Sequence, residues 1–193
     1  MVVVAVDIDE VLAPMLFTMK KWKYPKKLLP PRYPYVYKDI FRIPQSQSAK
    51  MVRDFYQTEE FRTMKPIHGS QTALKNLTFN SDFTFYVVSG RQDFVYDETC
   101  DWINYWYPGV FKDVILTDSY TPREIRKSDV CKSINAAAII DDSHTICMDC
   151  NDSGIVPLNF IGDPVYPWCF YNPWAVHNWS ETTQHLLYCF ETC

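Results

Sequence analysis

The sequence lacks an apolar run of the roughly 18 residues that a membrane-spanning helix requires. Its first residues also lack the basic stretch, apolar core and small-residue cleavage site of a secretory signal. We therefore expect no membrane partner and a cytoplasmic location. With 47% hydrophobic and 22% charged residues, the 193-residue chain is typical of a globular protein of one domain, or of one domain with a large insertion.

Cysteine is present without the pattern of a disulfide framework. Seven cysteines, an odd number, are scattered over the later part of the chain, so we expect reduced thiols. Cys147 and Cys150 form a Cys-x-x-Cys pair, but a second pair or histidines at matching spacing are missing. Two buried side chains on a short helix are therefore favoured over a zinc site.

Positive charge is concentrated in one part of the chain. Residues 14–65 hold twelve Lys and Arg against four Asp and Glu, whereas the rest of the chain holds seven against nineteen. A basic segment on an acidic body indicates contact with an anion, such as a phosphorylated small molecule, a nucleic acid or a phosphoprotein. A solvated surface of flexible lysines is the alternative.

Two patterns divide the chain. After an apolar strand at residues 2–6, residues 15–75 are rich in proline and aromatic residues, which predicts an irregular loop followed by helices, one of them over residues 46–57. From residue 71 onward helices and strands alternate, with strands predicted at 83–90, 111–118, 136–143 and 154–160. Helices are predicted between these strands, at 71–78, 94–106 and 123–134, and again from about residue 179.

This alternation specifies right-handed crossovers and a parallel sheet that is covered on both faces. We predict an α/β fold, a Rossmann-like three-layer sandwich with a mainly parallel sheet, built from residues 1–14 and 70–193. Residues 15–69 would form a small, partly helical cap insertion. The aromatic residues of the C-terminal stretch are expected to cover an edge of the sheet.

Acidic and hydroxyl side chains follow the predicted strands, whose carboxyl ends meet at one edge of a parallel sheet. Asp7 and Asp9 follow the first strand, and Asp141 and Asp142 follow a later one. Four carboxylates so close together need a cation, and oxygen ligands of this kind suit Mg²⁺. Helix capping by Asp9 and Asp142 is the alternative, but capping would explain only one of the two aspartate pairs. We therefore expect all four aspartates to serve a magnesium site.

Four stretches at these positions resemble, in order, the motifs of the haloacid dehalogenase (HAD) superfamily. They are "VAVDIDEVLAP", "FYVVSGR", the lysine-containing "RKSDVCKSI" and "AAIIDDS", and they lie within residues 2–143. This superfamily places its smaller cap between the first and second motifs, where residues 15–69 lie. In layout the chain is most similar to the 5′(3′)-deoxyribonucleotidase branch, whose cap is helical and lined with aromatic residues.

The resemblance implies a HAD-like fold and a role for each motif residue. Asp7 would be the nucleophile that attacks a phosphoryl group, and Asp9 would protonate the leaving oxygen and then deprotonate the attacking water. Ser89 and the Gly90 amide would hydrogen-bond the phosphoryl oxygens, while a lysine neutralises their charge. The paired aspartates 141 and 142 would bind Mg²⁺, the first directly and the second as a ligand or as support.

Three positions leave alternatives open. Lys127 opens a predicted helix and would point toward the strand ends, whereas Lys132 lies one turn further along and would face away, which favours Lys127. Arg91 would either bind a substrate phosphate or pair with Asp93. Glu10 stands where many members of the superfamily have glycine, so the loop after Asp9 would either be shaped differently or carry an extra acid near the site.

These features predict a Mg²⁺-dependent phosphatase for a small phosphorylated substrate, with nucleoside monophosphates as the preferred class. Trp22 and Tyr35 of the cap would stack on a base, or else pack within the cap. A phosphatase for a phosphoprotein or a nucleic-acid end is the competing enzyme, with nucleic acid not favoured. A non-catalytic binding protein that retains the fold is the third hypothesis.

Overall fold

The computed structural model describes residues 1–190 of the chain. Its central strand shows how the sequence pattern builds the sheet. In β1 (Val2–Val6), Val4 and Val6 belong to an apolar cluster on one face, while Ala5 belongs to the cluster on the other, and all three are fully buried. Successive side chains of a strand point to opposite faces, so a continuous apolar run is what a strand covered on both faces requires.

Within the described residues, six strands form one sheet in the order β3-β2-β1-β4-β5-β6, and all neighbouring pairs are parallel. Besides β1 they are β2 (Phe83–Ser89), β3 (Phe111–Leu116), β4 (Ala138–Asp141), β5 (Val156–Phe160) and the short β6 (Ala175–Val176). The prediction of a mainly parallel α/β sheet is confirmed. Because β1 lies between β2 and β4, the ends of these three strands are neighbours.

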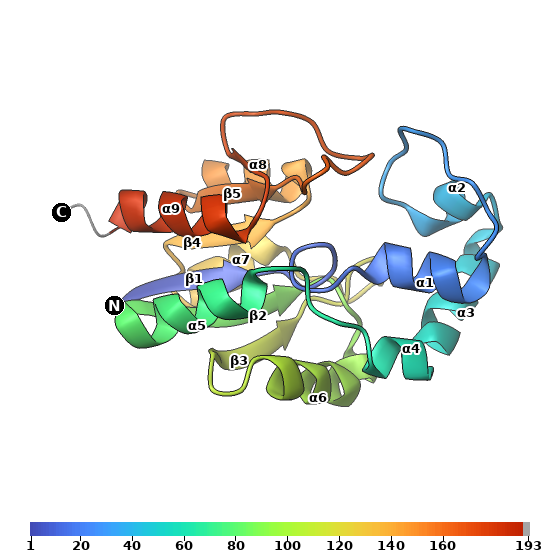
Figure 1. Ribbon diagram of the computed structural model, residues 1–193, viewed down its shortest axis with the longest axis horizontal. Coiled ribbons are helices and arrows are strands. Elements are labelled where there is room, and N and C mark those ends of the chain that lie inside the picture. Colours follow the sequence, from blue (N-terminus) through green and yellow to red (C-terminus); the bar gives the residue numbers. More distant parts are fainter. Residues whose placement is uncertain (191–193) are drawn as a thin grey trace.

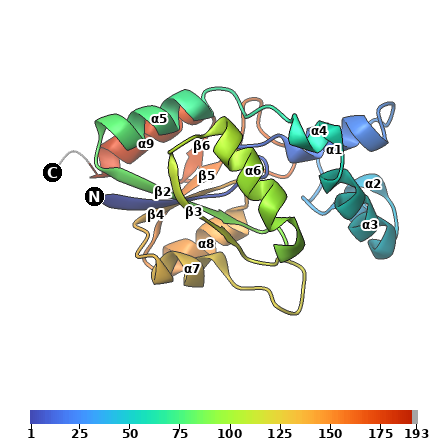
Figure 2. The same cartoon turned by 90° about the horizontal axis from the view of Figure 1, so that it is seen from below.

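Helices cover both faces of the sheet (Figure 2). On one face lie α5 (Ser70–Asn80) and α9 (Trp179–Phe190), and on the other lie α7 (Lys127–Ser133) and α8 (His144–Asp152). A short 3₁₀ turn, η1 (Asp93–Val95), leads into α6 (Tyr96–Trp106), which packs beside β3. The three-layer sandwich is thus as predicted. None of the helices within residues 1–190 has the length and apolar character needed to cross a membrane.

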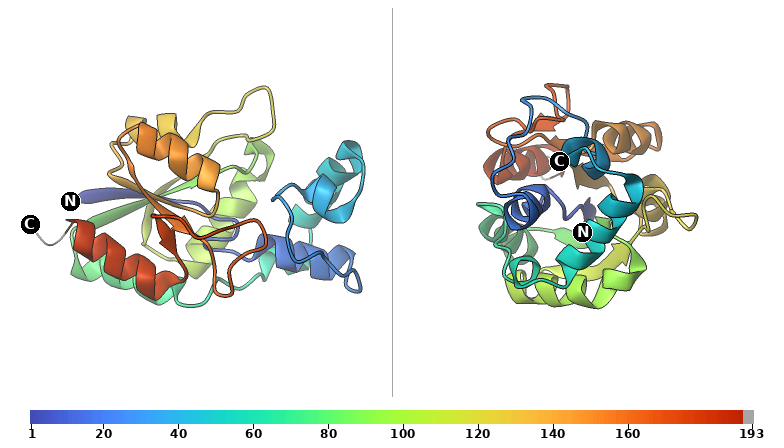
Figure 3. Two further views of the ribbon diagram at one scale, coloured as in Figure 1. Left: turned by 90° about the horizontal axis from the view of Figure 1, so that it is seen from above. Right: turned by 90° about the vertical axis from the view of Figure 1, so that its right-hand side faces the viewer.

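Residues 15–69, called here the helical segment, gather beyond the carboxyl ends of the strands (Figures 1 and 3). The segment contains α1 (Met15–Lys23), α2 (Tyr37–Phe41), α3 (Gln45–Tyr56) and α4 (Glu59–Arg62). The expected irregular start is wrong, because α1 begins directly at Met15 and buries Met15, Leu16 and Met19. The clustered prolines, which break regular structure, start at Pro25, after this helix has ended.

The six described cysteines form no disulfide. Cys147 and Cys150 are both buried in α8, as the non-metal interpretation of the Cys-x-x-Cys pair requires. The expectation of a reduced thiol at Cys193 falls outside the described residues.

One apolar cluster runs without interruption from the sheet into the helical segment. Phe55 of α3 and Phe61 of α4 are fully buried and belong to the same cluster as Val6 and Phe85 of the sheet. The ring centroids of Phe55 and Phe61 lie 5.9 Å apart in an edge-to-face arrangement. Because the two parts share one core, we expect them to unfold together.

Replacing Phe55 with alanine tests this shared core. The substitution should lower the free energy of unfolding by about 3–5 kcal/mol, the usual cost of removing a buried phenylalanine ring. Urea unfolding should remain a single transition when it is followed by far-ultraviolet circular dichroism and by tryptophan fluorescence. Phe79→Ala on α5, where the ring is 60% exposed, is the control and should change stability by no more than about 0.5 kcal/mol. An early transition confined to the helical segment would contradict the shared core.

Candidate active site

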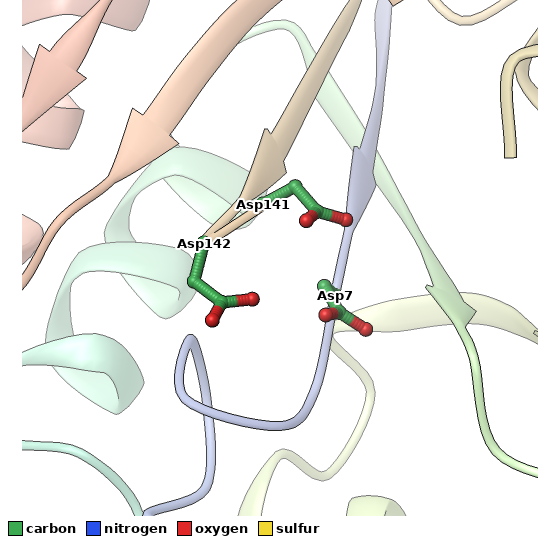
Figure 4. Close-up of side chains that lie close together, drawn as sticks. All are labelled: Asp7, Asp141 and Asp142. Atoms are coloured by element: carbon green, nitrogen blue, oxygen red, sulfur yellow. The ribbon is translucent and has the colours of Figure 1, made fainter. Parts of the chain in front are cut away.

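Three carboxylates meet at the carboxyl ends of two neighbouring strands (Figure 4). Asp7 follows β1, Asp141 ends β4, and Asp142 comes directly after it. One oxygen from each lies within 4.8 Å of the others, and all three side chains are buried. The backbone N–H of Asp7 donates to the carbonyl of Ile140 at 2.9 Å, which fixes the two strand ends relative to each other.

A buried lysine completes this cluster. Lys127 is the first residue of α7, and its Nζ lies 2.9 Å from Asp7 Oδ1 and 2.7 Å from Asp141 Oδ2. Burial disfavours its positive charge, but Asp141 and Asp7 outweigh this effect and raise the pKa of Lys127 above its usual value. Lys132, the competing candidate, is exposed. The helix begins at residue 127 rather than at 123, and this first-turn position directs Lys127 toward the strand ends.

Burial also raises the pKa of two acids in the cluster. It raises the pKa of Asp7 to about 7; Lys127 opposes the shift, and the charges of Asp141 and Asp9 add to it. Burial, followed by the charges of Asp141 and Asp7, raises the pKa of Asp142 well above its ordinary value. A single ammonium group cannot neutralise three buried carboxylates, so the cluster favours a further cation.

The donor set fits a magnesium ion. Asp7 Oδ1 is buried and lies 2.9 Å from Lys127 Nζ, an ammonium that it shares with Asp141. Buried carboxylates that share one ammonium, with Asp142 beside them, match the oxygen ligands that a hard divalent cation prefers. Among residues 1–190, Asp7, Asp141 and Asp142 make up the one group of three or more acid, histidine or cysteine side chains with this spacing.

Asp9 lies outside this group, although the sequence placed it among the metal ligands. Its Oδ1 accepts hydrogen bonds from Arg91 Nη2 at 2.7 Å and from Arg91 Nε at 3.2 Å. Arg91 is buried, also donates to Thr99 Oγ1 at 3.2 Å, and places its guanidinium 5.1 Å from the centroid of the Phe61 ring. Of the two alternatives for Arg91, pairing with Asp93 is wrong, because the side chain turns inward to Asp9, and contact with a substrate phosphate stays a prediction.

The second motif lies beside this ion pair. Ser89 ends β2 and is 1% exposed, and its Oγ accepts a hydrogen bond from the Arg91 N–H at 3.4 Å. Gly90 lines the cavity described below, and a Cβ at this position would lie 3.0 Å from Ser119 Oγ. Ser89 and Gly90 remain the candidates for contact with phosphoryl oxygens.

Glu10 shows why glycine suits the position after the second aspartate. Its backbone has φ = 67°, in the left-handed region that side chains other than glycine adopt at a cost. Its buried carboxylate offsets this cost by accepting hydrogen bonds from the Leu16 N–H at 2.6 Å and from the Tyr35 hydroxyl at 3.2 Å. Burial raises the pKa of Glu10 to about 8. The additional acid therefore ties the loop after Asp9 to the helical segment.

A cavity of about 700 Å³ opens onto the carboxylates. Its lining includes the three grouped aspartates and Lys127, together with aromatic side chains of the helical segment and of the loop after β5, namely Tyr35, Tyr37, Tyr56, Trp168 and Phe170. Tyr35 therefore lies where the sequence predicted a substrate contact. Trp22 is not among the lining residues, and its ring packs on Phe55 with a centroid distance of 5.5 Å.

Sequence reasoning missed Trp168. Its Nε1 donates a hydrogen bond to Asp142 Oδ2 at 2.7 Å. This part of the C-terminal stretch was expected to cover a sheet edge, but β6 forms that edge and Trp168 lies against the site. The available signal was position, since Trp168 follows β5, whose carboxyl end adjoins that of β4.

The parallel sheet, the acids after β1 and β4, and the lysine that opens α7 together define a HAD-type hydrolase. Solved structures agree on the fold. A haloacid dehalogenase-like hydrolase from Streptococcus pneumoniae is similar over 96% of this chain and 98% of its own, with a TM-score of 0.65 and 14% identity. A HAD hydrolase from Bacillus subtilis, solved with bound magnesium, matches over 96% and 98%, with a TM-score of 0.59 and 13% identity. One from Geobacter sulfurreducens matches over 96% of both chains, with a TM-score of 0.53 and 13% identity.

A comparison with curated proteins finds no match. A model of the family described as 5′ nucleotidase, deoxy (pyrimidine), cytosolic type C matches residues 1–152. The chain belongs to this family, and it is a phosphoric monoester hydrolase. The predicted relationship to the HAD phosphatases, near the deoxyribonucleotidase branch, is confirmed.

The Arg91–Asp9 pair gives a prediction for stability. Arg91→Met should lower the free energy of unfolding by about 3 kcal/mol, because it leaves Asp9 without its partner beside other carboxylates. Arg62→Met is the matched control, since this side chain and its partner Glu59 are 57% and 73% exposed, and its loss should cost no more than about 1 kcal/mol. Urea unfolding at neutral pH measures both, and equal losses would show that the buried pair has no special weight.

Proposed function

We propose that this protein is a Mg²⁺-dependent nucleotidase that hydrolyses nucleoside monophosphates through an aspartyl-phosphate intermediate. The observation that carries the proposal is the placing of Asp7, Lys127 and the paired aspartates 141 and 142 at the floor of a cavity with aromatic walls. The family to which the chain belongs supports the nucleotide as substrate.

Each step falls to a residue of this chain. An Asp7 carboxylate oxygen attacks phosphorus, the bond from phosphorus to the ester oxygen breaks, and Asp9 supplies the proton that the leaving alcohol needs. A water molecule then attacks the aspartyl-phosphate, Asp9 takes its proton, and inorganic phosphate leaves with the Asp7 carboxylate restored. Arg91 holds the Asp9 carboxylate in place between these steps.

The negative charge of the phosphoryl oxygens is met by positive and donating groups. The Lys127 ammonium lies at the cluster, and the Ser89 hydroxyl and the Gly90 N–H are the proposed hydrogen-bond donors. Asp7, Asp141 and Asp142 would hold Mg²⁺. When bound, the ion supplies charge neutralisation at the phosphoryl oxygens and lowers the repulsion between the carboxylates.

The helical segment is proposed to act as the cap that selects the substrate. Tyr35, Tyr37 and Tyr56 from this segment line the cavity and offer flat surfaces for a base. Lys38 and Arg53 line it as well, so part of the basic charge of the segment faces the cavity. Trp22 contributes to packing on Phe55 instead of lining the cavity.

A substrate panel with and without Mg²⁺ tests the proposal. It contains deoxyribo- and ribonucleoside monophosphates, an aryl phosphate, a phosphopeptide and a 5′-phosphorylated oligonucleotide. Phosphate release should be fastest with a nucleoside monophosphate and should stop when a chelator removes Mg²⁺. Preference for the phosphopeptide or the oligonucleotide would replace the proposed substrate class with the competing one, and turnover without divalent cation would refute the metal site.

Asp7→Asn identifies the nucleophile within the same panel. Activity should fall below detection, because the amide cannot attack phosphorus, while the thermal unfolding midpoint stays close to that of the wild type. Asp101→Asn on the exposed side of α6 is the control and should keep full activity. Retention of normal phosphatase activity in Asp7→Asn would sink the mechanism.

A pair of variants tests how the cap selects its substrate. Tyr35→Leu should lower kcat/KM for the preferred nucleotide relative to the aryl phosphate. The loss should correspond to about 1–3 kcal/mol of transition-state free energy, the range measured for base stacking on aromatic side chains. Trp22→Leu should instead lower thermal stability and leave the ranking of substrates unchanged, since this ring packs on Phe55. Both activities are measured at saturating Mg²⁺, and a parallel loss of both in Tyr35→Leu under that condition would mean that the ring only packs.

A further inference from the structure

Four consecutive residues of the loop after β5, called here the 166–169 segment, lie beside the cavity, and two of them hold Asp142. Trp168 Nε1 donates to Asp142 Oδ2 at 2.7 Å, and the Cys169 thiol lies 3.3 Å from the Asp142 carbonyl oxygen in hydrogen-bond geometry. Both the side chain and the main chain of this aspartate are therefore fixed by neighbouring residues. An indole N–H is a donor only, so its bond engages one carboxylate oxygen and leaves the other for a cation.

The same four residues contact the helical segment. The Trp168 ring packs against Tyr35 at a centroid distance of 4.6 Å and against Tyr33 at 6.0 Å. Arg32 Nη1 donates to the carbonyl of Cys169 at 2.6 Å. The proposed cap and the 166–169 segment are thus joined by ring packing and by a charge-assisted hydrogen bond.

A third contact leads to the loop after the nucleophile. The Tyr166 ring stacks on Trp168, with centroids 4.8 Å apart and planes inclined by 18°. The Tyr166 hydroxyl donates to the carbonyl of Glu10 at 2.9 Å. Rings on more than one side hold the indole, so that its N–H stays directed at Asp142.

We propose that Trp168 is a positioning residue for Mg²⁺ binding, one that orients Asp142 and couples metal affinity to the docking of the helical segment. A partner that hydrogen-bonds a metal ligand fixes the orientation in which that ligand binds, and its loss commonly weakens metal affinity by about 10–100-fold. In Figure 4 the two oxygens of Asp142 point in different directions, and one faces the carboxylates of Asp7 and Asp141. Coupling of this kind is reciprocal, so bound Mg²⁺ would in turn stabilise the docked segment. The inference rests on the magnesium site of the proposed function.

Calorimetric titration of Mg²⁺ into the metal-free full-length protein tests the inference without use of activity. Trp168→Phe keeps a ring between its aromatic neighbours and removes the N–H, and we expect it to bind Mg²⁺ about tenfold more weakly than the wild type. Trp174→Phe is the matched control on the same loop, where the ring stacks on His144, and its Mg²⁺ affinity should not change.

Tyr35→Leu extends the test to the coupling. Removing the ring that packs on Trp168 should weaken Mg²⁺ binding several-fold, although Tyr35 is not one of the proposed metal ligands. Thermal midpoints measured in chelator show whether each variant is folded. Should Trp168→Phe fail to fold, Trp168→His, which keeps an aromatic ring with a ring N–H, carries the test and should bind Mg²⁺ within about threefold of the wild type.

The outcomes separate the inference from the proposed function. If the wild type binds no Mg²⁺, the magnesium site fails and the inference fails with it. Wild-type affinity in a folded Trp168→Phe, or a tenfold loss in Trp168→His when that variant carries the test, overturns the inference and leaves the proposed function standing. Unchanged affinity in Tyr35→Leu overturns the coupling.

Discussion

Repulsion among three buried carboxylates is the constraint on which the rest of the structure depends. Asp7, Asp141 and Asp142 share one small volume, and a single ammonium, Lys127, lies among them. Burial raises the pKa of Asp7 and of Asp142, which is the cost of assembling acids away from water. A divalent cation would relieve this repulsion, and the proposed phosphoryl transfer would use the same cation.

The surrounding elements keep the acids in distinct states and orientations. Arg91 binds Asp9 through its Nε and Nη2 and so separates it from the three grouped carboxylates, while Trp168 binds one oxygen of Asp142. Arg91 follows β2 and Trp168 follows β5, the two strands that flank β1 and β4 in the sheet. Asp9 and Asp142 are thereby each held by a separate donor, whereas Asp7 and Asp141 share Lys127, which is how neighbouring carboxylates can perform different roles.

The helical segment contributes both to the stability of the fold and to the proposed selection of the substrate. Its buried rings, such as Phe55, extend the core of the sheet, while Tyr35 faces the cavity. Glu10 ties the two parts together, because its carboxylate accepts from the Leu16 N–H and the Tyr35 hydroxyl. A cap anchored in this way would place its aromatic walls at a defined distance from the nucleophile, so the core that stabilises the chain also shapes the substrate site.

The sequence by itself determined the parallel α/β sheet and the positions of Asp7, Ser89 and Asp141, because short apolar strands ending in polar residues specify buried strands whose ends share one edge. Regular periodicity also located α3 and the start of α9 to within a residue. Only the tertiary structure decided which side chains meet. The pairing of Arg91 with Asp9 and the reach of Trp168 to Asp142 span 82 and 26 residues of sequence, and local pattern carries no information on contacts at such separations.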